Sequence, residues 1–400
     1  MEHCMSESMT LLNAQLGFLD THVALIHIPL QAYPLFLQAI SQLLLRNGRH
    51  DEHGTPTLPS RPWNYWHPFV NVSLTPNECS VVCPRQVADD LFAPIIARID
   101  PSLKGMVSIS KEDYSVVTID GEGLEAGQRV LDLTTPLAMA GIPIFFITSY
   151  WSDFILVPLK ARSKVIKALE GRGFVFEAEA NGEAGHMKNP TSPTLMSHHH
   201  RPGSSTSSLD STPIATTPPP TTLTELQART FAKLKKAGVA PSVDTRIELV
   251  TCAGIKETMA SSQANNFTEG KLQLGLIKCL TSHPPPAFFS LTLTDTESAS
   301  VTLEKSLLPL FYHDGEDLLL GKDGPEQIAI TLDLRDLPLE STGIVCGVAS
   351  QLIDGMKRRI GGEMFDVSYL STAKAGHVIV YEDELSDVMD SLQEAQQNGF

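Results

Sequence analysis

Apolar residues recur in short runs along this chain, and polar turns separate the runs. The first run, at 22–29, is followed by a stretch in which apolar side chains return every three or four residues, from Leu35 to Leu44. That spacing places those side chains on one face of a helix. The pattern therefore predicts a strand at 22–29 and a helix at 31–46.

Apolar runs and helix-spaced stretches alternate in the same way up to residue 177. Strand, helix, strand, strand, helix, strand is the order of the split βαβ, ferredoxin-like arrangement. We therefore expect small α/β sandwiches in this part of the chain. The further strands are expected at 68–74, 78–83, 113–120, 143–149, 153–158 and 173–177, and the further helices at 124–140 and 160–171.

The second half of the chain repeats this pattern in the same order. An internal repeat of this length indicates a duplicated chain. The fold class that we predict is α/β (α+β), with tandem ferredoxin-like βαββαβ units, four of them in two internally repeated halves. The segments that correspond are 23–27 with 247–251, 69–84 with 288–303, 114–120 with 328–334, and 144–157 with 367–380.

A change in composition separates the two halves. Residues 181–222 hold seven prolines, seven serines, eight threonines and no aromatic residue. Such a segment buries too little apolar surface to offset its ordering entropy, and a short basic helix is expected after it, at 223–237. The predicted division is a first domain at 11–105, a second at 106–178, a disordered linker with the short helix at 179–244, a third domain at 245–325 and a fourth at 326–400.

Composition and charge narrow the class of protein. Apolar residues make up 42% of the chain, and 30 Lys and Arg stand against 46 Asp and Glu, for a net charge of −16. This balance argues against a nucleic acid or an anionic membrane as the main partner. The N-terminus lacks the basic start and apolar core of a signal peptide, and the most apolar stretch, 133–147, is too short to span a bilayer. The six cysteines follow no disulfide spacing, so we expect a cytoplasmic protein with reduced thiols.

Few positions carry the chemistry of a catalytic or metal site. The glycine-rich stretch at 121–127 follows a predicted strand, but its spacing is not that of a dinucleotide loop. The histidines at 198–200 stand in the predicted linker without a cysteine or carboxylate beside them. Cys79 and Cys83 lie on one face of a predicted strand, as small buried side chains do. We therefore predict no catalytic residues, no metal and no cofactor, and a protein that is not an enzyme.

Two predicted hairpin turns are more informative. Segments 148–153 (Thr-Ser-Tyr-Trp-Ser-Asp) and 371–376 (Ser-Thr-Ala-Lys-Ala-Gly) occupy the same place in the repeat, between two apolar strands. Hydroxyl groups beside a carboxylate at such a turn can hold an ammonium or guanidinium group. They can equally close the turn by bonding to the neighbouring backbone. These residues alone leave both interpretations open.

The same segments carry a resemblance to a known family. The sequence at 148–157, TSYWSDFILV, resembles the STYxTDFILV of the CASTOR-type tandem ACT-domain proteins, the arginine sensors upstream of the TOR kinase in animals. Ser290-Leu-Thr with its acidic turn, Gly343-Ile-Val and Ser371-Thr also match. The resemblance covers most of the chain outside the linker, and such paired ACT domains are more distantly similar to the regulatory domains of aspartate kinases. It implies four ACT domains, with an amino acid bound between the second and the fourth.

The resemblance also implies a set of ligand-binding residues. Pro143 and Ile144 stand where the family has a Ser-Val pair, and Gly376 stands where it has the aspartate that contacts the ligand. Without that acid, a buried guanidinium group would lack its counter-charge. A smaller or more apolar amino acid than arginine, or no ligand, is therefore predicted. The complete implied set is Pro143, Ile144, Ser341, Gly343, Ile344, Val345, Thr372 and Gly376.

The function that this resemblance implies is that of a non-catalytic regulator. Such a protein would sense a small amino acid and act through a protein partner in TOR signalling, with homodimer formation as an option. Two other hypotheses stay open. The chain is alternatively a ligand-free protein-interaction module, which would use its edge strands or its acidic C-terminal helix, or an allosteric subunit of an amino-acid biosynthetic enzyme.

Overall fold

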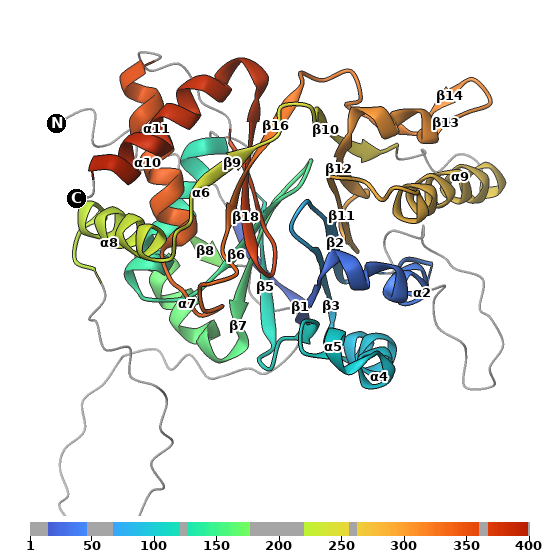
Figure 1. Cartoon of the computed structure of the whole chain (residues 1–400), viewed down its shortest axis with the longest axis horizontal. Coiled ribbons are helices and arrows are strands. Elements are labelled where there is room, and N and C mark those ends of the chain that lie inside the picture. The colour runs from blue at the N-terminus through green and yellow to red at the C-terminus, as the bar shows by residue number, and fades with distance from the viewer. Residues whose placement is uncertain are drawn as a thin grey trace, which may run out of the picture.

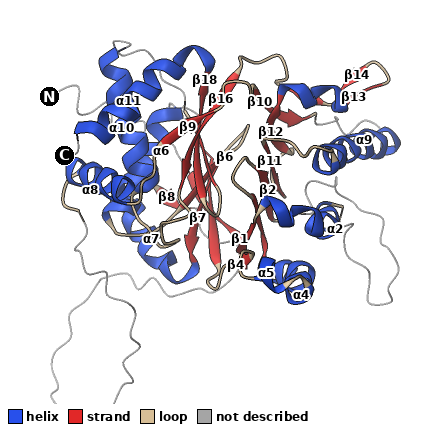
Figure 2. Cartoon of the chain, in the orientation of Figure 1, coloured by secondary structure: helices blue, strands red, loops and turns tan. Residues whose placement is uncertain are grey.

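Strands occupy the middle of the molecule, and helices lie on its two outer sides (Figures 1 and 2). The computed structural model describes residues 15–45, 67–120, 126–176, 220–255, 262–359 and 367–398. Within these ranges the fold is mixed α+β, as predicted from the alternation of apolar runs and helix-spaced stretches.

The first half of the chain begins with a long strand and ends with a short one. Its strands are β1 (Gln15–Ile28), β2 (Phe69–Leu74), β3 (Cys79–Pro84), β4 (Ser108–Ile109), β5 (Tyr114–Asp120), β6 (Phe145–Thr148), β7 (Asp153–Pro158) and β8 (Val175–Phe176). Its helices are α2 (Tyr33–Leu44), α3 (Arg85–Val87), α4 (Ala93–Arg98), α5 (Pro101–Lys104), α6 (Ala126–Met139) and α7 (Arg162–Glu170).

The second half follows with a similar order of elements. Its helices are α8 (Leu223–Lys236), α9 (Ser262–Thr281), α10 (Ile344–Arg359) and α11 (Leu385–Asn398). Its strands are β9 (Pro241–Val243), β10 (Leu249–Gly254), β11 (Phe289–Thr294), β12 (Ser300–Glu304), β15 (Leu319–Leu320), β16 (Gln327–Asp333), β17 (Ser368–Ser371) and β18 (Ala375–Tyr381), and a small separate ribbon joins β13 (Tyr312–His313) to β14 (Glu316–Asp317).

The strand pairings connect the two halves at both ends. Strand β2 runs antiparallel to β11, with Val72 opposite Leu291, and β6 meets β17, with Ile147 opposite Leu370. The order of neighbours is β15-β10-β12-β11-β2-β3-β1-β5-β7-β6-β17-β18-β16-β9, and a further pairing joins β10 to β16. That last contact closes twelve of these strands into a ring of pairings. The two halves therefore form one continuous sheet.

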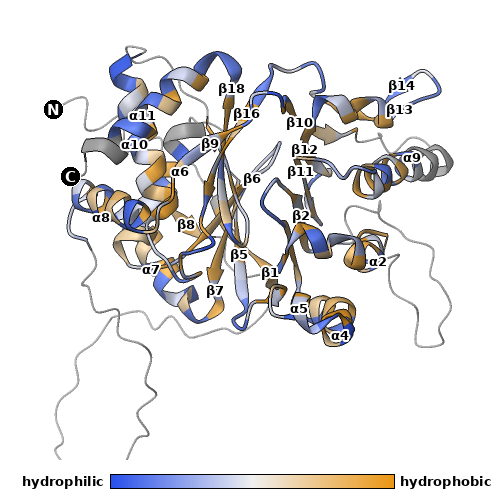
Figure 3. Cartoon of the chain, viewed as in Figure 1, coloured by the Kyte–Doolittle hydropathy of each residue, from blue (hydrophilic) through white to orange (hydrophobic). Residues whose placement is uncertain are grey.

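Three main clusters of buried side chains hold the fold together, with a small fourth one where α6, α8 and α10 meet. One core packs α2, α4 and α9 on β1, β2, β3, β10, β11 and β12. A second packs α6, α7, α8, α10 and α11 on β5, β6, β7, β16, β17, β18 and the start of β1. The third, which includes Phe69, Phe154, Phe288 and Leu370, is formed by residues of both halves. The hydropathy colouring shows hydrophobic residues along the central strands, and hydrophobic and hydrophilic residues alternating along the outer helices (Figure 3).

Most of the predicted elements of the first half are present, and the differences lie in β1 and in the segment between β3 and β5, where α3, α4, α5 and β4 were not predicted. Strand β1 begins at Gln15, ahead of the predicted strand at 22–29, and its register shifts between Phe18 and His22. The polar residues around this irregularity interrupt the apolar pattern, so the sequence shows only the second part of the strand. The helical segments between 85 and 98 were not predicted, because their turns are short and mix polar with apolar residues.

The short basic helix expected at 223–237 is present as α8. It packs closely on α10, because a Cβ atom at Gly343 would lie 2.8 Å from Leu226, and one at Gly347 would lie 2.7 Å from Thr230. Strand β9 follows α8 and pairs with β16. Both elements thus pack against the unit expected at 326–400, although the sequence assigns them to the linker. The domain boundaries themselves stay a prediction, and 177–219 lies outside the described residues.

Several expectations concern thiols, metals and membranes. The five cysteines in the described ranges are buried and unbridged, as predicted. Within the same ranges no three His, Cys, Asp or Glu side chains gather as a metal site. None of the helices that the structure describes combines the length and the apolar character needed to cross a lipid bilayer. The glycine-rich loop at 121–125 and the histidines at 198–200 lie outside the described residues.

Candidate functional site

A small pocket lies where α10 begins, between the two halves of the chain. Its volume is about 50 Å³. Such a space holds a few water molecules, so an amino acid would enter only after part of the wall moves. The wall is formed by Ile144, Phe145, Leu334, Leu337, Pro338, Leu339, Ser341, Gly343, Ile344, Val345, Tyr369, Ser371, Thr372, Ala373 and Ala375.

The structure brings most of the predicted site residues together. Six of the eight line this pocket: Ile144, Ser341, Gly343, Ile344, Val345 and Thr372. Pro143 is not part of the wall but directly precedes it in the chain. Gly376 is not part of the wall either, and it pairs across the hairpin with Ser371, which is. The predicted residues therefore surround one location, although that role in ligand binding stays a prediction.

Tyr369 is one of the wall residues that the sequence did not identify. Its ring is buried, and its hydroxyl has no hydrogen-bond partner among the described residues. A Cβ atom at Gly376 would overlap that hydroxyl, so the phenol occupies the space that a longer side chain at 376 would need. Burial also raises the pKa of Tyr369 well above its usual range, which keeps the phenol neutral.

The first turn of α10 supplies the polar side of the pocket. The first N–H groups of an α-helix have no acceptor within the helix, and they favour negative charge. Gly343 precedes this turn with φ 81°, a conformation that favours glycine. Leu226 and Thr230 of α8 pack directly against Gly343, and the Thr230 hydroxyl donates a hydrogen bond to its carbonyl, at 3.1 Å. Helix α8 therefore fixes the loop from which α10 starts.

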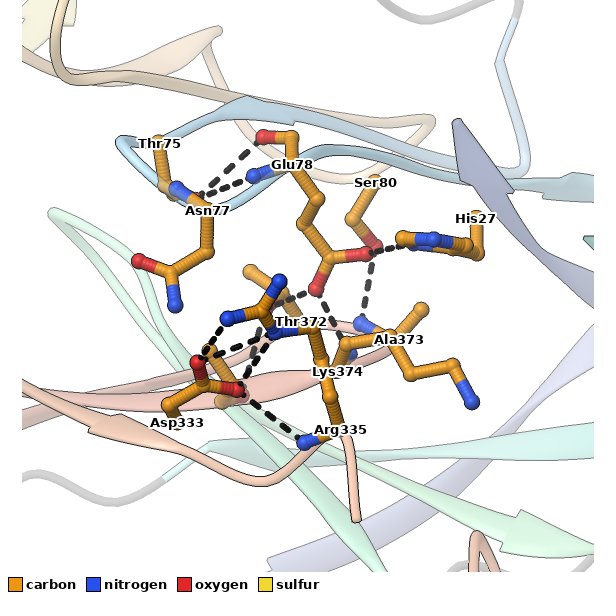
Figure 4. Close-up of polar contacts among 11 residues, drawn as sticks. His27, Thr75, Asn77, Glu78, Ser80, Asp333, Arg335, Thr372, Ala373 and Lys374 are labelled. Carbon is orange, nitrogen blue, oxygen red and sulfur yellow. Dashed lines mark hydrogen bonds and ion pairs between the residues drawn. The ribbon is translucent and has the colours of Figure 1, made fainter. Parts of the chain in front are cut away.

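The β17–β18 turn, which forms another wall, is held by Glu78 from the first half. The Glu78 carboxylate is fully buried and accepts hydrogen bonds from the Thr372 hydroxyl, at 2.7 Å, and from the Lys374 N–H, at 2.6 Å (Figure 4). His27 Nδ1 lies 2.5 Å from its other oxygen. The Ala373 N–H also donates to Ser80, at 3.1 Å. Loss of one partner would leave the other groups of this buried network without hydrogen bonds, which is costly inside a protein. The position of the β17–β18 turn therefore depends on residues of the first half.

The corresponding hairpin in the first half is bound in a similar way by the second. Ser152 in the β6–β7 turn donates to Glu297, and the Tyr150 N–H donates to Ser300, at 2.8 Å. The acid of this hairpin, Asp153, is buried and forms an ion pair with Arg129 of α6. An ion pair inside the protein supports the interpretation of Asp153 as part of the turn.

Comparison with solved structures finds similarity at low sequence identity. Protein Atu0741 of Agrobacterium tumefaciens is 17% identical over 43% of this chain and 97% of its own, with a TM-score of 0.28. Aspartate kinase from Synechocystis is 9% identical over 98% of this chain and 57% of its own, with a TM-score of 0.32. The ligand-free regulatory subunit of aspartate kinase from Thermus thermophilus is 16% identical over 38% of this chain and 95% of its own, with a TM-score of 0.25.

A family model matches part of the first half of the chain. No curated protein sequence matches the chain. The family model of the ACT domain matches residues 109–171, which run from the end of β4 to the residue that follows α7. This segment contains Ile144 and the hairpin around Asp153, and it is the part of the chain that is similar to the ACT domain family.

Proposed function

We propose that this protein is a non-catalytic regulator of the CASTOR type, built from four ferredoxin-like ACT units, with an amino acid bound between the second and the fourth. The observation that carries the proposal is the gathering of six of the eight predicted residues around one pocket, beside which the Tyr369 hydroxyl is buried without a partner among the described residues. An unpaired buried hydroxyl costs free energy, and a ligand that enters after the wall moves supplies the missing partner.

The two ends of an amino acid fit different parts of the pocket. The ligand carboxylate binds at the first turn of α10, where the N–H groups of Ile344 and Val345 lack acceptors within the helix. The ligand side chain points toward Tyr369, and the hydroxyls of Ser341 and Ser371 lie on the same wall. This pose uses only groups that line the pocket.

The wall residues favour a small amino acid with an uncharged side chain. None of the side chains that line the pocket carries a charge. A guanidinium group buried there would lack a counter-charge, and desolvation of an unpaired charge is strongly unfavourable. Arginine is therefore a poor ligand on this proposal, and amino acids with apolar or hydroxylated side chains are better ones.

Regulation would follow from the position of the pocket between the two halves. A ligand shifts a conformational equilibrium only through its different affinity for the two states. The loop at 334–343 and the β17–β18 turn are the walls whose movement admits a ligand, so they are the elements that differ between the free and bound states. A protein partner in TOR signalling that reads these elements completes the proposed function, in the cytoplasm and with homodimer formation as an option.

The test is a thermal-shift and calorimetry panel of the twenty amino acids with the full chain. We expect a small set of uncharged amino acids to bind, and Tyr369→Phe to weaken the binding of hydroxylated ligands by roughly fivefold to tenfold. Tyr33→Phe is the matched control, because the Tyr33 hydroxyl bonds to the Leu280 carbonyl in the other core. Binding of arginine in preference to uncharged amino acids would contradict the proposed ligand class, and no binding at all would favour a ligand-free interaction module.

A further inference from the structure

A second and larger cavity lies on the other side of the β2–β3 turn. Its volume is about 230 Å³, which exceeds the volume of roughly 150 Å³ at which engineered cavities admit a benzene ring. Pro76 and Ser242 on its wall are exposed, so a small molecule can reach it. The wall consists of Pro76, Asn77, Ser242, Val243, Asp244, Ile247, Phe288, Ala329 and Thr331.

The side chains of this cavity favour an apolar molecule with a neutral or cationic end. Phe288, Ile247 and Ala329 form part of an apolar surface, and no basic side chain is present on the wall. Asp244 supplies the one charge there, and it is held by Arg246, whose Nη2 atom lies 2.7 Å from Oδ2. Arg246 also donates its backbone N–H and its Nε–H to Oδ1, which leaves one of the four lone-pair sites of the carboxylate for a further donor. An anion finds no basic side chain on the wall.

The β2–β3 turn connects this cavity to the candidate pocket. The turn is closed by the Thr75 N–H, which donates to the Glu78 carbonyl at 2.9 Å. Asn77 lines the larger cavity, and its neighbour Glu78 binds the Thr372 hydroxyl and the Lys374 N–H of the β17–β18 turn (Figure 4). Asn77 and Glu78 are adjacent in this closed turn, so a ligand that displaces Asn77 also displaces Glu78.

We propose that this cavity is a second small-molecule site, for a ring-sized apolar molecule with a neutral or cationic polar end, and that its occupant acts through Glu78 on the β17–β18 turn. Glu78 is then a positioning residue, since it touches neither ligand. Any change in ligand affinity at the candidate pocket rests on the proposed function. Binding in the cavity and its effect on the β17–β18 turn do not depend on the proposed function.

The binding step is tested with benzyl alcohol, benzylamine and benzoate, which share a ring and differ in charge. We expect the first two to bind the full chain at millimolar concentration in ligand-observed NMR, and benzoate to bind at least about tenfold more weakly. Ala329→Leu, which fills the cavity, should abolish binding, whereas Ala228→Leu on α8, outside the cavity, should not. Asp244→Asn should weaken benzylamine selectively, and it serves if Ala329→Leu does not fold.

The coupling step is tested by amide hydrogen exchange of the β17–β18 turn, without any ligand in the candidate pocket. Glu78→Gln should accelerate exchange at Lys374 by about tenfold, and benzyl alcohol should alter exchange there in the wild-type chain only. Glu297→Gln is the matched control, because Glu297 contacts the β6–β7 turn instead. Absence of binding by all three compounds, binding that survives Ala329→Leu, or an unchanged turn in Glu78→Gln would overturn the proposal.

Discussion

His377 gives the protein a stability that depends on pH in a defined window. The imidazole is fully buried in β18, with Nδ1 3.0 Å from the Thr331 hydroxyl and its ring edge-on to Phe288. Nε2 has no hydrogen-bond partner among the described residues. Desolvation by burial lowers the pKa of His377 from 6.5 to about 4, and the charge of Glu78 opposes this shift only in part.

The direction of the effect follows from the protons that each state binds. Between pH 6.5 and 4 the unfolded chain protonates this histidine and the folded chain does not. The stabilisation is therefore complete above pH 6.5 and is lost as the pH falls through this window. With these two pKa values, the free energy of unfolding drops by about 2 kcal/mol between pH 7 and pH 5. Carboxyl groups with a lowered pKa, such as Asp244 at about 2, act at lower pH.

The measurement is urea unfolding of the wild-type chain and of His377→Gln at several pH values from 7 to 5. Glutamine is neutral throughout this range, so the difference between the two chains isolates the contribution of His377. We expect the variant to lack about 2 kcal/mol of the pH-dependent loss, whatever its stability at pH 7. Equal slopes for the two chains would refute the reasoning, because they would mean that the imidazole titrates equally in both states.

Two further predictions concern buried contacts. Arg129→Met leaves the buried Asp153 carboxylate without its cation, so the free energy of unfolding in urea should fall by about 3 kcal/mol. Asp153→Asn in the same chain should restore most of that loss. A double variant as unstable as the single one would argue against the ion pair. A Cβ atom at Gly355 of α10 would overlap Ser391 of α11, so Gly355→Ala should destabilise the fold by about 1–2 kcal/mol. With Ser391→Gly present, which removes both overlapping atoms, the same change should become neutral or stabilising because alanine favours helices over glycine. Thermal unfolding that showed the same cost in both backgrounds would contradict this contact.

Many of the helices and strands could be predicted, because apolar periodicity marks them in the sequence. The helix expected at 31–46 contains α2, and the two runs on either side of Asp153 are strands β6 and β7. The N-terminal part of β1 could not be predicted, because its partner β5 lies about a hundred residues away. Periodicity describes a local face, whereas pairing across such a distance depends on tertiary contacts.

In the candidate site, too, the residues that a local pattern marks could be predicted, and those that depend on tertiary contacts could not. The predicted residues Ser341, Gly343, Ile344 and Val345 came from a match to a short motif, and they do line one pocket. Tyr369 and Glu78 were missed because their roles depend on neighbours that are distant in sequence or lie across a hairpin. The signal for Tyr369 is Gly376 itself, since a glycine on a neighbouring strand leaves room for an aromatic ring. The signal for Glu78 is its match to Glu297 in the repeat.

The two junctions between the halves have a symmetry that the pairings make visible. Val72 lies opposite Leu291, and Ile147 lies opposite Leu370. Val72 and Leu291 are equivalent when 69–84 is aligned with 288–303. Ile147 and Leu370 are equivalent when 144–157 is aligned with 367–380. An interface in which a residue meets its own counterpart is the isologous interface of a twofold homodimer.

The two junctions therefore have the geometry that fusion of the two subunits of a homodimer would produce. In a true homodimer every substitution appears twice, so both copies of a site change together. In a fused chain each copy changes alone. One hairpin here keeps its acid and binds Arg129 of the chain itself, while the other has a glycine at that place and a tyrosine beside it. Two such hairpins in one chain can therefore differ in chemistry, with an ion-paired carboxylate in one and a glycine beside a buried tyrosine in the other.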